Sequence, residues 1–301
     1  MAPGGQRPPV SVIIPCYNQA HFLGQALDSA LSQRYPDVEV IVVDDGATDD
    51  TAAVAARYPA ARYVWQPNQG LSAARNAGWR ASKGELVVFL DADDRLLPGA
   101  LDAGVQQLVL HAHAVFTFGR HLKIDAEGRP LPTPRQPLVV ERHYETLLRM
   151  NYIAMPAKVM YRGEALEAVG GFARGLDAAA DYDLYLRLTQ RFPVVAHTTF
   201  VAEYRQHGDN MSGDAALMLR TTSAILRARA RAHRGEAPLR EACREGRRYF
   251  AEYYGTRLLS ALKGAVRERR WHEAGRHGRA LAPHGGWLAG YAGRRLRSLI
   301  A

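Results

Sequence analysis

The sequence has few cysteines and no long apolar run. Its 301 residues include only Cys16 and Cys243, which lie far apart and form no CxxC pair. This excludes a disulfide framework and a structural zinc site, so we expect two ordinary buried thiols. No stretch reaches the roughly 18 uninterrupted apolar residues that a spanning helix requires. Residues 1–9 are rich in glycine and proline without an apolar signal segment, so we expect a flexible N-terminus and a cytoplasmic protein.

Acidic residues are scarce in the last part of the chain. Residues 220–301 hold 19 Lys and Arg against 6 Asp and Glu, while residues 1–219 hold 20 against 24. The formal net charge of +9 therefore comes from the tail. Such a tail attracts anionic partners, including phospholipid headgroups, lipid-linked phosphates and nucleic acid. Solvated helix faces would explain the same composition.

Apolar residues stand among the arginines at the end of this tail. They are Trp287, Leu288, Tyr291, Leu296, Leu299 and Ile300. Their pattern is consistent with a helix at a membrane interface and equally with packing against the rest of the protein, and a contact between copies of the chain is a third possible role. We expect peripheral binding to anionic membrane at the inner face. We expect no nucleic-acid partner, because no aromatic RNA-reading motif accompanies the charge.

Apolar, β-rich runs alternate with segments of helical periodicity through the first part of the chain. The runs cover 10–15, 38–43, 62–65 and 86–90, and the helical segments cover 21–33, 48–57, 71–82 and 100–111. Thr48 or Asp49 is placed to cap the second helix. Continuous apolar strands alternating with amphipathic helices predict a largely parallel sheet covered on both faces.

The rest of the chain is less regular and then helical. Between about Arg120 and Gln206 it shows a proline-rich loop at 130–137, a helix near 144–150 and a strand at 158–161. From about Ala215 it is helical and arginine-rich, without strand signals.

Acidic residues follow the fourth apolar run, where a parallel sheet binds its ligands beyond the strand ends. Asp91, Asp93 and Asp94 crowd three carboxylates, and their repulsion is costly unless a cation or hydrogen-bond donors offset it. A divalent ion bridging to a diphosphate would do so, and oxygen ligands suit Mg²⁺ or Mn²⁺. A turn with helix-capping aspartates before Pro98 is the alternative.

Two other strand ends carry candidate binding residues. Asp44-Asp45-Gly46 follows the second run, and its carboxylates suit a ribose hydroxyl or a base N–H, although Asp-Gly is also an ordinary turn. Tyr17 follows the first run, and its ring could stack on a nucleobase or simply pack. We expect these residues to converge on one edge of the sheet with the acidic loop.

These motifs together resemble family 2 glycosyltransferases in order and spacing. The first four are Val12-Ile13-Ile14-Pro15-Cys16-Tyr17-Asn18, Val42-Val43-Asp44-Asp45-Gly46-Ala47-Thr48-Asp49, Asn68-Gln69-Gly70-Leu71-Ser72-Ala73-Ala74-Arg75-Asn76 and Phe89-Leu90-Asp91-Ala92-Asp93-Asp94. The later ones are Val169-Gly170-Gly171-Phe172, Asp181-Tyr182-Asp183-Leu184-Tyr185-Leu186-Arg187-Leu188 and Tyr204-Arg205-Gln206-His207. The resemblance covers about residues 9–212.

The resemblance implies a GT-A fold, a Rossmann-like α/β domain with a mainly parallel sheet flanked by helices. This domain would cover residues 10–212. Its first half, about 10–118, would hold the nucleotide, and its second half, about 119–212, would shape the acceptor site. Residues 213–301 would form a basic, α-helical C-terminal extension.

The resemblance also implies roles for residues around the nucleotide-sugar donor. Tyr17 and Asp45 would hold the base, and Pro15 would shape that pocket. Arg75 would lie near the nucleotide, and Asp91 would face the ribose or the water shell of the metal.

The metal ligands and the catalytic base follow in the same way. Asp93 would bind Mn²⁺ or Mg²⁺ directly, and His207 would complete the metal or diphosphate site. Asp181 matches the general base, which would take the proton of an acceptor hydroxyl as it attacks the anomeric carbon and inverts it. A helix cap is the alternative role for Asp181, and Asp183 is the neighbouring carboxylate that could point into the site instead.

Gly171 and Phe172 are similar to the acceptor-side loop of the family and would bind the acceptor. A helix end followed by a turn would look alike. The chain departs from the family pattern at Ala180, where glutamate is usual, and at Ala47, where serine is usual. Loss of that glutamate removes a charge beside the base.

We therefore expect an inverting, metal-dependent hexosyltransferase that uses a nucleotide-diphospho-sugar, most often UDP-linked in this family. Its acceptor would be a hydroxyl of a glycan or lipid-linked molecule in cell-surface polysaccharide or glycoconjugate synthesis. The alternative is a non-catalytic, nucleotide-sugar-binding subunit of a polysaccharide assembly system. The loop Pro15-Cys16-Tyr17-Asn18-Gln19 lacks the glycine-rich, basic sequence of sugar-nucleotide pyrophosphorylases, and no GxGxxG supports a dehydrogenase.

Overall fold

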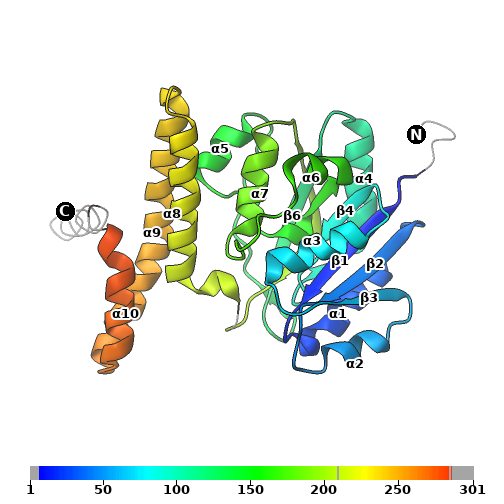
Figure 1. Ribbon diagram of the computed structural model, residues 1–301, viewed down its shortest axis with the longest axis horizontal. Helices are drawn as coiled ribbons and strands as arrows, with labels where there is room; N and C mark the ends of the chain where they lie inside the picture. The colour runs from blue at the N-terminus through cyan, green and yellow to red at the C-terminus, as the bar shows by residue number, and fades with distance from the viewer. Residues whose placement is uncertain (1–6, 209, 285, 287–301) are drawn as a thin grey trace. The chain divides into compact units, whose positions relative to one another are not determined.

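The computed structural model describes residues 7–208, 210–284 and 286. The described chain divides into two compact units. The first contains residues 7–143 and 152–207, and the second contains 144–151 and the described residues from 208 (Figure 1). The apolar tail residues from Trp287 to Ile300 lie outside the described residues.

The first unit is built on one mixed sheet, which contains nine strands among the described residues. Their order is β3-β2-β1-β4-β8-β6-β9-β5, and β7 pairs with β6. The strands are β1 Val10–Cys16, β2 Val38–Asp44, β3 Ala61–Trp65, β4 Leu86–Phe89, β5 Arg95–Leu96, β6 Phe116–Ile124, β7 Pro130–Leu131, β8 Val159–Arg162 and β9 Val195–Arg205.

The predicted parallel sheet is present in the first half of this unit. β1 pairs in parallel with β2 and β4, and β2 pairs in parallel with β3. The helices between these strands are α1 Ala20–Leu31, α2 Thr51–Ala56, α3 Leu71–Ala81 and α4 Ala100–Leu110. They agree with the predicted bounds within two residues except for α2. That helix begins at Thr51, three residues later than predicted, and Asp49 accepts hydrogen bonds from the N–H groups of Thr51 and Ala20.

Helices cover both faces of the parallel strands. Ile14 on one face of β1 belongs to a buried apolar cluster with Leu23 and Leu27 of α1. Ile13 points to the other face, where Gly78 of α3 lies so close that an added Cβ would overlap the Ile13 side chain. This two-sided burial explains why β1 and β2 are apolar at most positions rather than only at alternate ones.

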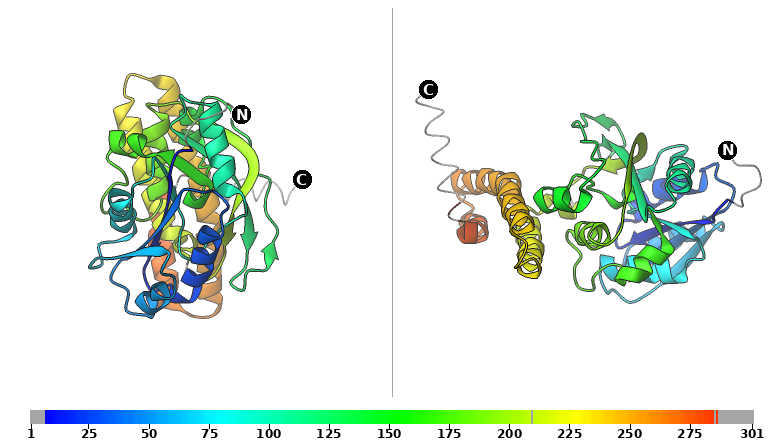
Figure 2. Two further views of the ribbon diagram at one scale, coloured as in Figure 1. Left: turned by 90° about the vertical axis from the view of Figure 1, so that its right-hand side faces the viewer. Right: turned by 90° about the horizontal axis from the view of Figure 1, so that it is seen from above.

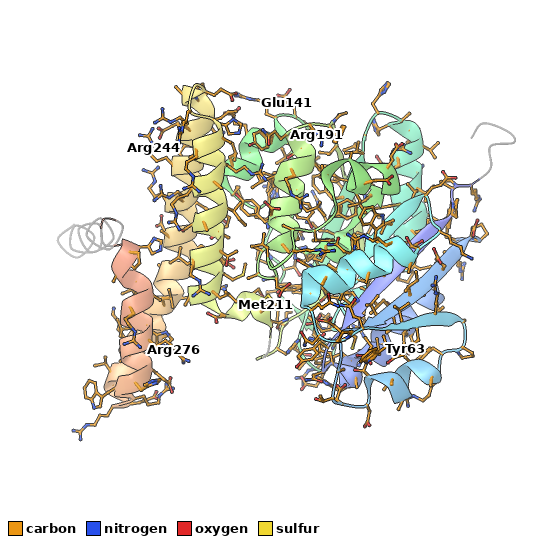
Figure 3. All side chains as sticks on the ribbon, viewed as in Figure 1. Tyr63, Glu141, Arg191, Met211, Arg244 and Arg276 are labelled. Carbon is orange, nitrogen blue, oxygen red and sulfur yellow. The ribbon has the colours of Figure 1, made fainter. Side chains whose placement is uncertain are left out.

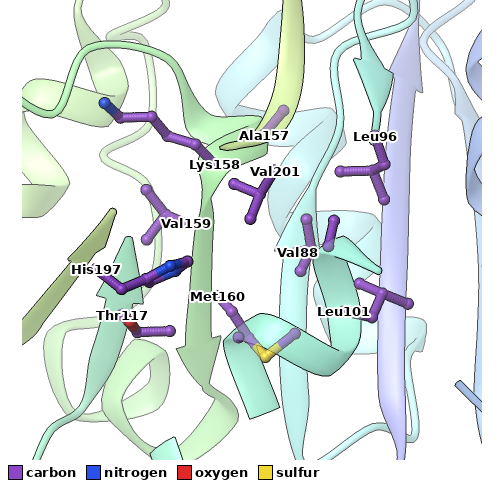
Figure 4. Close-up of a pocket in the computed structure, with 12 residues that line it drawn as sticks. Val88, Leu96, Leu101, Thr117, Ala157, Lys158, Val159, Met160, His197 and Val201 are labelled. Atoms are coloured by element: carbon purple, nitrogen blue, oxygen red, sulfur yellow. The ribbon is translucent and has the colours of Figure 1, made fainter. Parts of the chain in front are cut away.

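The second half of the sheet turns antiparallel at β8, which pairs with both β4 and β6. β9 returns beside β6 in parallel, with irregular register around Arg120. A cavity of about 20 Å³ lies among these strands and α4, enough for about one water (Figure 4). Lys158 lines it and is buried, and its Nζ donates to Gln136 Oε1 at 3.2 Å. Burial lowers the pKa of Lys158 to about 7.

Before residue 208, the described chain contains three more α-helices, α5 His143–Arg149, α6 Gly163–Val169 and α7 Ala180–Thr189, and the short 3-10 helix Pro156–Lys158. α5 lies mostly in the second unit, where Arg149 pairs with Glu245 at 2.7 Å. The second unit also contains α8 Ala215–Ala232, α9 Ala237–Arg267 and α10 Trp271–Leu281. α8 and α9 pack side by side (Figure 2).

The expected helical C-terminal region is confirmed, and so are the two free, buried thiols at Cys16 and Cys243. Burial raises the pKa of Cys16 to about 11, which keeps that thiol protonated. Among the described residues, no helix has the length and apolar character to cross a membrane.

Candidate functional site

The predicted site residues of the first half meet at the carboxyl edge of the parallel strands, as expected. The Asp45 N–H donates to the carbonyl of Cys16 at 3.0 Å, which brings the ends of β2 and β1 together. Tyr17 follows β1 with 48% of its side chain exposed, so its ring faces solvent at this edge. Pro15 is buried within β1 opposite Val43.

Asp45 organises the loop that precedes α3. Its carboxylate is buried and accepts hydrogen bonds from Gln66 Nε2 at 2.6 Å and from the N–H groups of Gln69 and Gly70, both at 2.9 Å. An isolated buried carboxylate would be costly, and these three donors offset that cost. Asp45 therefore holds the 66–70 loop at the sheet edge, and its contact with a base stays a prediction.

Asp177 ties a distant loop to the start of α3. The helix begins after Gly70 without a capping side chain of its own, and Asp177 Oδ1 accepts from the Ser72 N–H at 3.0 Å. Gly70 has φ +90°, and an added Cβ would collide with the Asp177 carboxylate. The Ser72 hydroxyl also donates to the Leu176 carbonyl. Residues separated by about a hundred positions in sequence thus form one wall of the site.

Arg75 and Asp91 form a partly buried ion pair at the centre of the site. Arg75 is 3% exposed, and its Nη2 donates to Asp91 Oδ1 at 2.6 Å. The guanidinium lies over the Phe172 ring, 5.1 Å from its centroid. Its Nε is buried and has no hydrogen-bond partner among the described residues, which is uncommon for a buried donor.

The acidic loop concentrates negative charge beside this pair. Burial raises the pKa of Asp91, the Arg75 guanidinium opposes the shift, and Asp93 adds to it. Burial followed by the charges of Asp93 and Asp91 raises the pKa of Asp94 well above its usual range. The Arg75 guanidinium balances part of this charge, and a proton or a bound cation would balance more of it.

His207 meets Asp93 although 114 residues separate them. Its Nε2 lies 2.9 Å from Asp93 Oδ2, and Gln19 Nε2 lies 3.4 Å from the same oxygen. The predicted metal pair is thus assembled, by the end of β9 reaching the acidic loop. Phe22 packs beside the His207 ring, with 4.9 Å between the centroids.

Arg205 explains how β9 reaches that position. This fully buried side chain donates from Nε to the Asp93 carbonyl at 2.7 Å, and its own N–H donates to Asp94 Oδ1 at 2.9 Å. It also donates to the Ala126 carbonyl and to Gln25 Oε1. Asp94 therefore has a structural partner, while Asp93 and Asp91 face the site.

The donor set suits a divalent cation that is completed by a substrate. Among the described residues, no group of three or more His, Cys, Asp and Glu side chains is arranged to hold a metal ion. Asp93 and His207 would supply two ligand atoms. Mg²⁺ and related ions commonly bind one or two protein carboxylates together with substrate phosphates. These two residues fit an ion whose other ligands come from a diphosphate.

The structure distinguishes Asp181 from Asp183. Asp183 pairs with Arg187 of the same helix at 2.7 Å. Burial raises the pKa of Asp181 to about 6, while the charge of Arg75 lowers it and that of Asp91 raises it. Asp181 thus lies within electrostatic reach of the Arg75–Asp91 pair, at the start of α7.

The loop before α7 contains Gly171 and Phe172, which lie against Asn76 of α3. Phe172 is 1% exposed, and it exchanges two backbone hydrogen bonds of 2.9 Å with the Asn76 side chain. Its ring packs edge-on against Phe89. The Phe172 ring packs against the Arg75 guanidinium. The acceptor-binding role of Gly171 and Phe172 stays a prediction.

Comparison with known protein families shows which family the chain belongs to. The family model of glycosyl transferase family 2 matches residues 11–170, more than half of the chain. The chain belongs to glycosyl transferase family 2.

Curated relatives of this family member include synthases of long polysaccharides. It is 28% identical to chondroitin synthase of Escherichia coli over 210 residues, which cover 68% of this chain and 30% of that one. It is also 28% identical to hyaluronan synthase of Pasteurella multocida over 211 residues, covering 68% and 21%. The chain thus spans less than a third of the length of these two relatives. It is 31% identical to the uncharacterized protein MT1568 of Mycobacterium tuberculosis over 205 residues, covering 62% and 64%.

Solved structures share the fold. TarS 1–349 of S. aureus, in complex with UDP-GlcNAc, matches with a TM-score of 0.64 and 20% identity over 81% of this chain and 73% of that one. Mannosyltransferase PcManGT of Pyrobaculum calidifontis, in complex with GDP-Man and Mn²⁺, matches with a TM-score of 0.63 and 19% identity, covering 94% and 88%. The expected GT-A type α/β fold with a helical C-terminal region is confirmed.

The sequence did not predict the supporting roles of Asp177, of Gln66 and Gln69 beside Asp45, or of Arg205. The sequence offers no capping side chain at Gly70, so it indicates that another residue must accept hydrogen bonds from the first N–H groups of α3. It does not indicate that this residue is Asp177. Arg205 lies in a motif that carries the family resemblance, and its buried role could not be read from the sequence. Gln66 carried no distinguishing pattern, and Gln69 lies in a motif that carries the family resemblance, although the sequence did not indicate its contact with Asp45.

Proposed function

We propose that the chain is an inverting glycosyltransferase that moves a hexose from a nucleotide-diphospho-sugar, UDP-linked, to an acceptor hydroxyl. The observation that carries the proposal is the convergence of the Asp93–His207 pair, the Arg75–Asp91 pair and Asp181 around one sheet edge. The names of the relatives support it, since two are polysaccharide synthases and one structural neighbour holds a UDP-sugar.

In this proposal each charged group has one task. Asp181 takes the proton of the acceptor hydroxyl as it attacks the anomeric carbon from the side opposite the diphosphate. Asp91 faces the ribose, and Arg75 offers its unpartnered Nε to donor oxygens. Tyr17 and Asp45 hold the base beside Pro15. Mn²⁺ or Mg²⁺ between Asp93, His207 and the diphosphate would neutralise charge on the leaving group.

The acceptor in this proposal is a glycan or a lipid-linked molecule of cell-surface polysaccharide or glycoconjugate synthesis. Gly171 and Phe172 would form part of the acceptor side. The basic tail would bring the chain to anionic membrane at the cytoplasmic face. The synthase names of the relatives support a polysaccharide product.

A transfer and hydrolysis assay with UDP-linked and GDP-linked sugars and Mn²⁺ tests the activity. We expect turnover with at least one donor, and we expect Asp93→Ala and Asp181→Asn each to reduce it by about a hundredfold or more. Asp183→Asn is the matched control, since it removes the neighbouring carboxylate that pairs with Arg187.

Donor binding without any turnover would support the alternative, a non-catalytic subunit that binds nucleotide-sugars. Turnover that survives Asp181→Asn would refute the role of this base. Turnover that is equally fast with EDTA and in Asp93→Ala would refute the metal site.

A further inference from the structure

The helical unit contains a cavity of about 870 Å³ that the donor site does not use. It is lined by α8, α9, α10 and the short helical turn Ala282–His284, all in the second unit. Figure 3 labels one of its residues, Arg276 on α10. The volume is typical of pockets that bind organic molecules and is far larger than a single ion requires.

The lining is strongly cationic. Its arginines are Arg220, Arg227, Arg257, Arg276 and Arg279. Within the described parts of the chain, none of these five arginines forms an ion pair with a carboxylate. The acidic residue of the lining is Asp214, and its Oδ1 already accepts from the N–H groups of Ala216 and Leu217 at the start of α8. The cavity therefore has an excess of positive charge that an anion would balance.

Two histidines, His277 and His284, also line the cavity. Burial lowers the pKa of His284, and the charges of Arg227 and Arg247 lower it further. A base whose proton is repelled by neighbouring arginines marks a place of high positive potential.

An orphaned hydroxyl gives a second, independent sign of a ligand. Ser223 lines the cavity, is 1% exposed, and its Oγ has no hydrogen-bond partner among the described residues. Buried hydroxyl groups in proteins almost always have one. Arg220, Ser223 and Arg227 are spaced three and four residues apart on α8 and so share one helix face. An oxygen-rich anion on this face would satisfy both the hydroxyl and the guanidinium groups.

We propose that this cavity binds an organic phosphate. Phosphate oxygens match the planar donor arrays of arginine and accept several charge-assisted hydrogen bonds at once. The carbon part of the ligand would lie against Leu217, Leu258 and Pro283, which line the same cavity. Five arginines favour a ligand with more than one phosphate charge. Both soluble phosphate esters and phospholipid headgroups have this chemistry.

Isothermal titration of the full chain in EDTA tests the cavity with two probes. Inorganic diphosphate represents a soluble phosphate, and monomeric dihexanoyl phosphatidate represents a lipid headgroup. We expect at least one to bind, and Arg220→Gln with Arg276→Gln to weaken that binding about tenfold or more. We expect Ser223→Ala to weaken it about threefold, as for the loss of one hydrogen bond.

A matched double variant separates the cavity from general charge. Arg231→Gln with Arg248→Gln removes two exposed arginines from α8 and α9 that do not line the cavity, and should leave the affinity unchanged. Binding of diphosphate alone would identify a soluble ligand, and clearly tighter binding of phosphatidate would identify a lipid.

Two results would overturn the proposal. One is no binding of either probe to the unaltered chain. The other is an equal loss in the cavity and control variants, with thermal unfolding showing that both are folded. The single variant Arg276→Gln repeats the test should the double variant not fold, because this side chain is exposed.

Discussion

Asp181 combines a raised pKa with a place at the proposed reaction centre. Burial is the main cause of its pKa of about 6, so the folded chain holds this proton more tightly than the unfolded chain does. The contribution of this group to stability is complete below a pH of about 4 and is lost as the pH rises through about 6. At neutral pH the carboxylate is ionised, ready to act as a base and costly to the fold.

Asp181→Asn should therefore stabilise the protein while stopping transfer. At pH 7.5 we expect the free energy of unfolding to rise by about 1 to 3 kcal/mol, and at pH 4 by about zero, because the native carboxyl is then protonated. Urea unfolding at the two pH values measures the difference. For the unaltered chain, kcat/KM should fall as the pH drops below about 6.

Asp183→Asn serves as the control, since the Asp183 carboxylate has Arg187 as its partner. It should bring no gain in stability at pH 7.5. A gain from Asp181→Asn that is the same at both pH values would show that ionisation of this buried carboxylate is not its cause.

At the scale of elements, burial explains why two of the strands were predicted. β1 and β2 are apolar through most of their length because helices cover both faces, so their runs predicted strands well. β9 was not predicted, since part of its eleven residues is exposed and its pairing with β6 is irregular, which removes a clean alternation.

The residues of the candidate site also differ in how well the sequence predicted them. Asp93 and Asp181 are found in motifs a few residues long, so the sequence identified them. The contact between Asp177 and Ser72 spans 105 residues, and it depends on where the loop before α7 folds back. No local period or spacing reports such a contact.

Gly246 of α9 lies directly against the backbone of α5, which gives an element-scale prediction. A Cβ at Gly246 would overlap the carbonyl oxygen of Leu148, a backbone atom that cannot turn away. We expect Gly246→Ala to lower the free energy of unfolding by about 1 to 3 kcal/mol, as overpacking does. Chemical denaturation of the full chain, followed by circular dichroism, measures it.

Gly264 of the same helix is the matched control. An added Cβ there meets nothing within 4 Å, so Gly264→Ala should instead stabilise the helix by about 0.5 to 1 kcal/mol. Equal effects of the two substitutions would mean that helix propensity, and not the contact with α5, governs position 246.

At the scale of the whole molecule, charge is divided between two parts of the sequence. Residues 1–219 carry 20 basic and 24 acidic side chains, whereas residues 220–301 carry 19 and 6. A tail with this excess produces a positive field that any anionic surface feels, whether or not a specific cavity is present. Attraction by this field depends on all the arginines of the tail, whereas binding in the cavity depends on the arginines that line it.

This difference yields a prediction for membrane binding. The full chain should cosediment with vesicles that contain phosphatidylserine at low salt, and should be released near 1 M salt, where the Debye length falls to about 3 Å. Vesicles of pure phosphatidylcholine should not bind it. The double variants Arg220→Gln with Arg276→Gln and Arg231→Gln with Arg248→Gln should weaken vesicle binding to a similar degree, by up to about 1 kcal/mol for each arginine. Attraction by a diffuse field depends only on the number of charges. Binding that resists salt, or a loss seen only in the variant Arg220→Gln with Arg276→Gln, would therefore contradict this prediction. Either result would mean that a specific site, and not the net charge of the tail, binds the membrane.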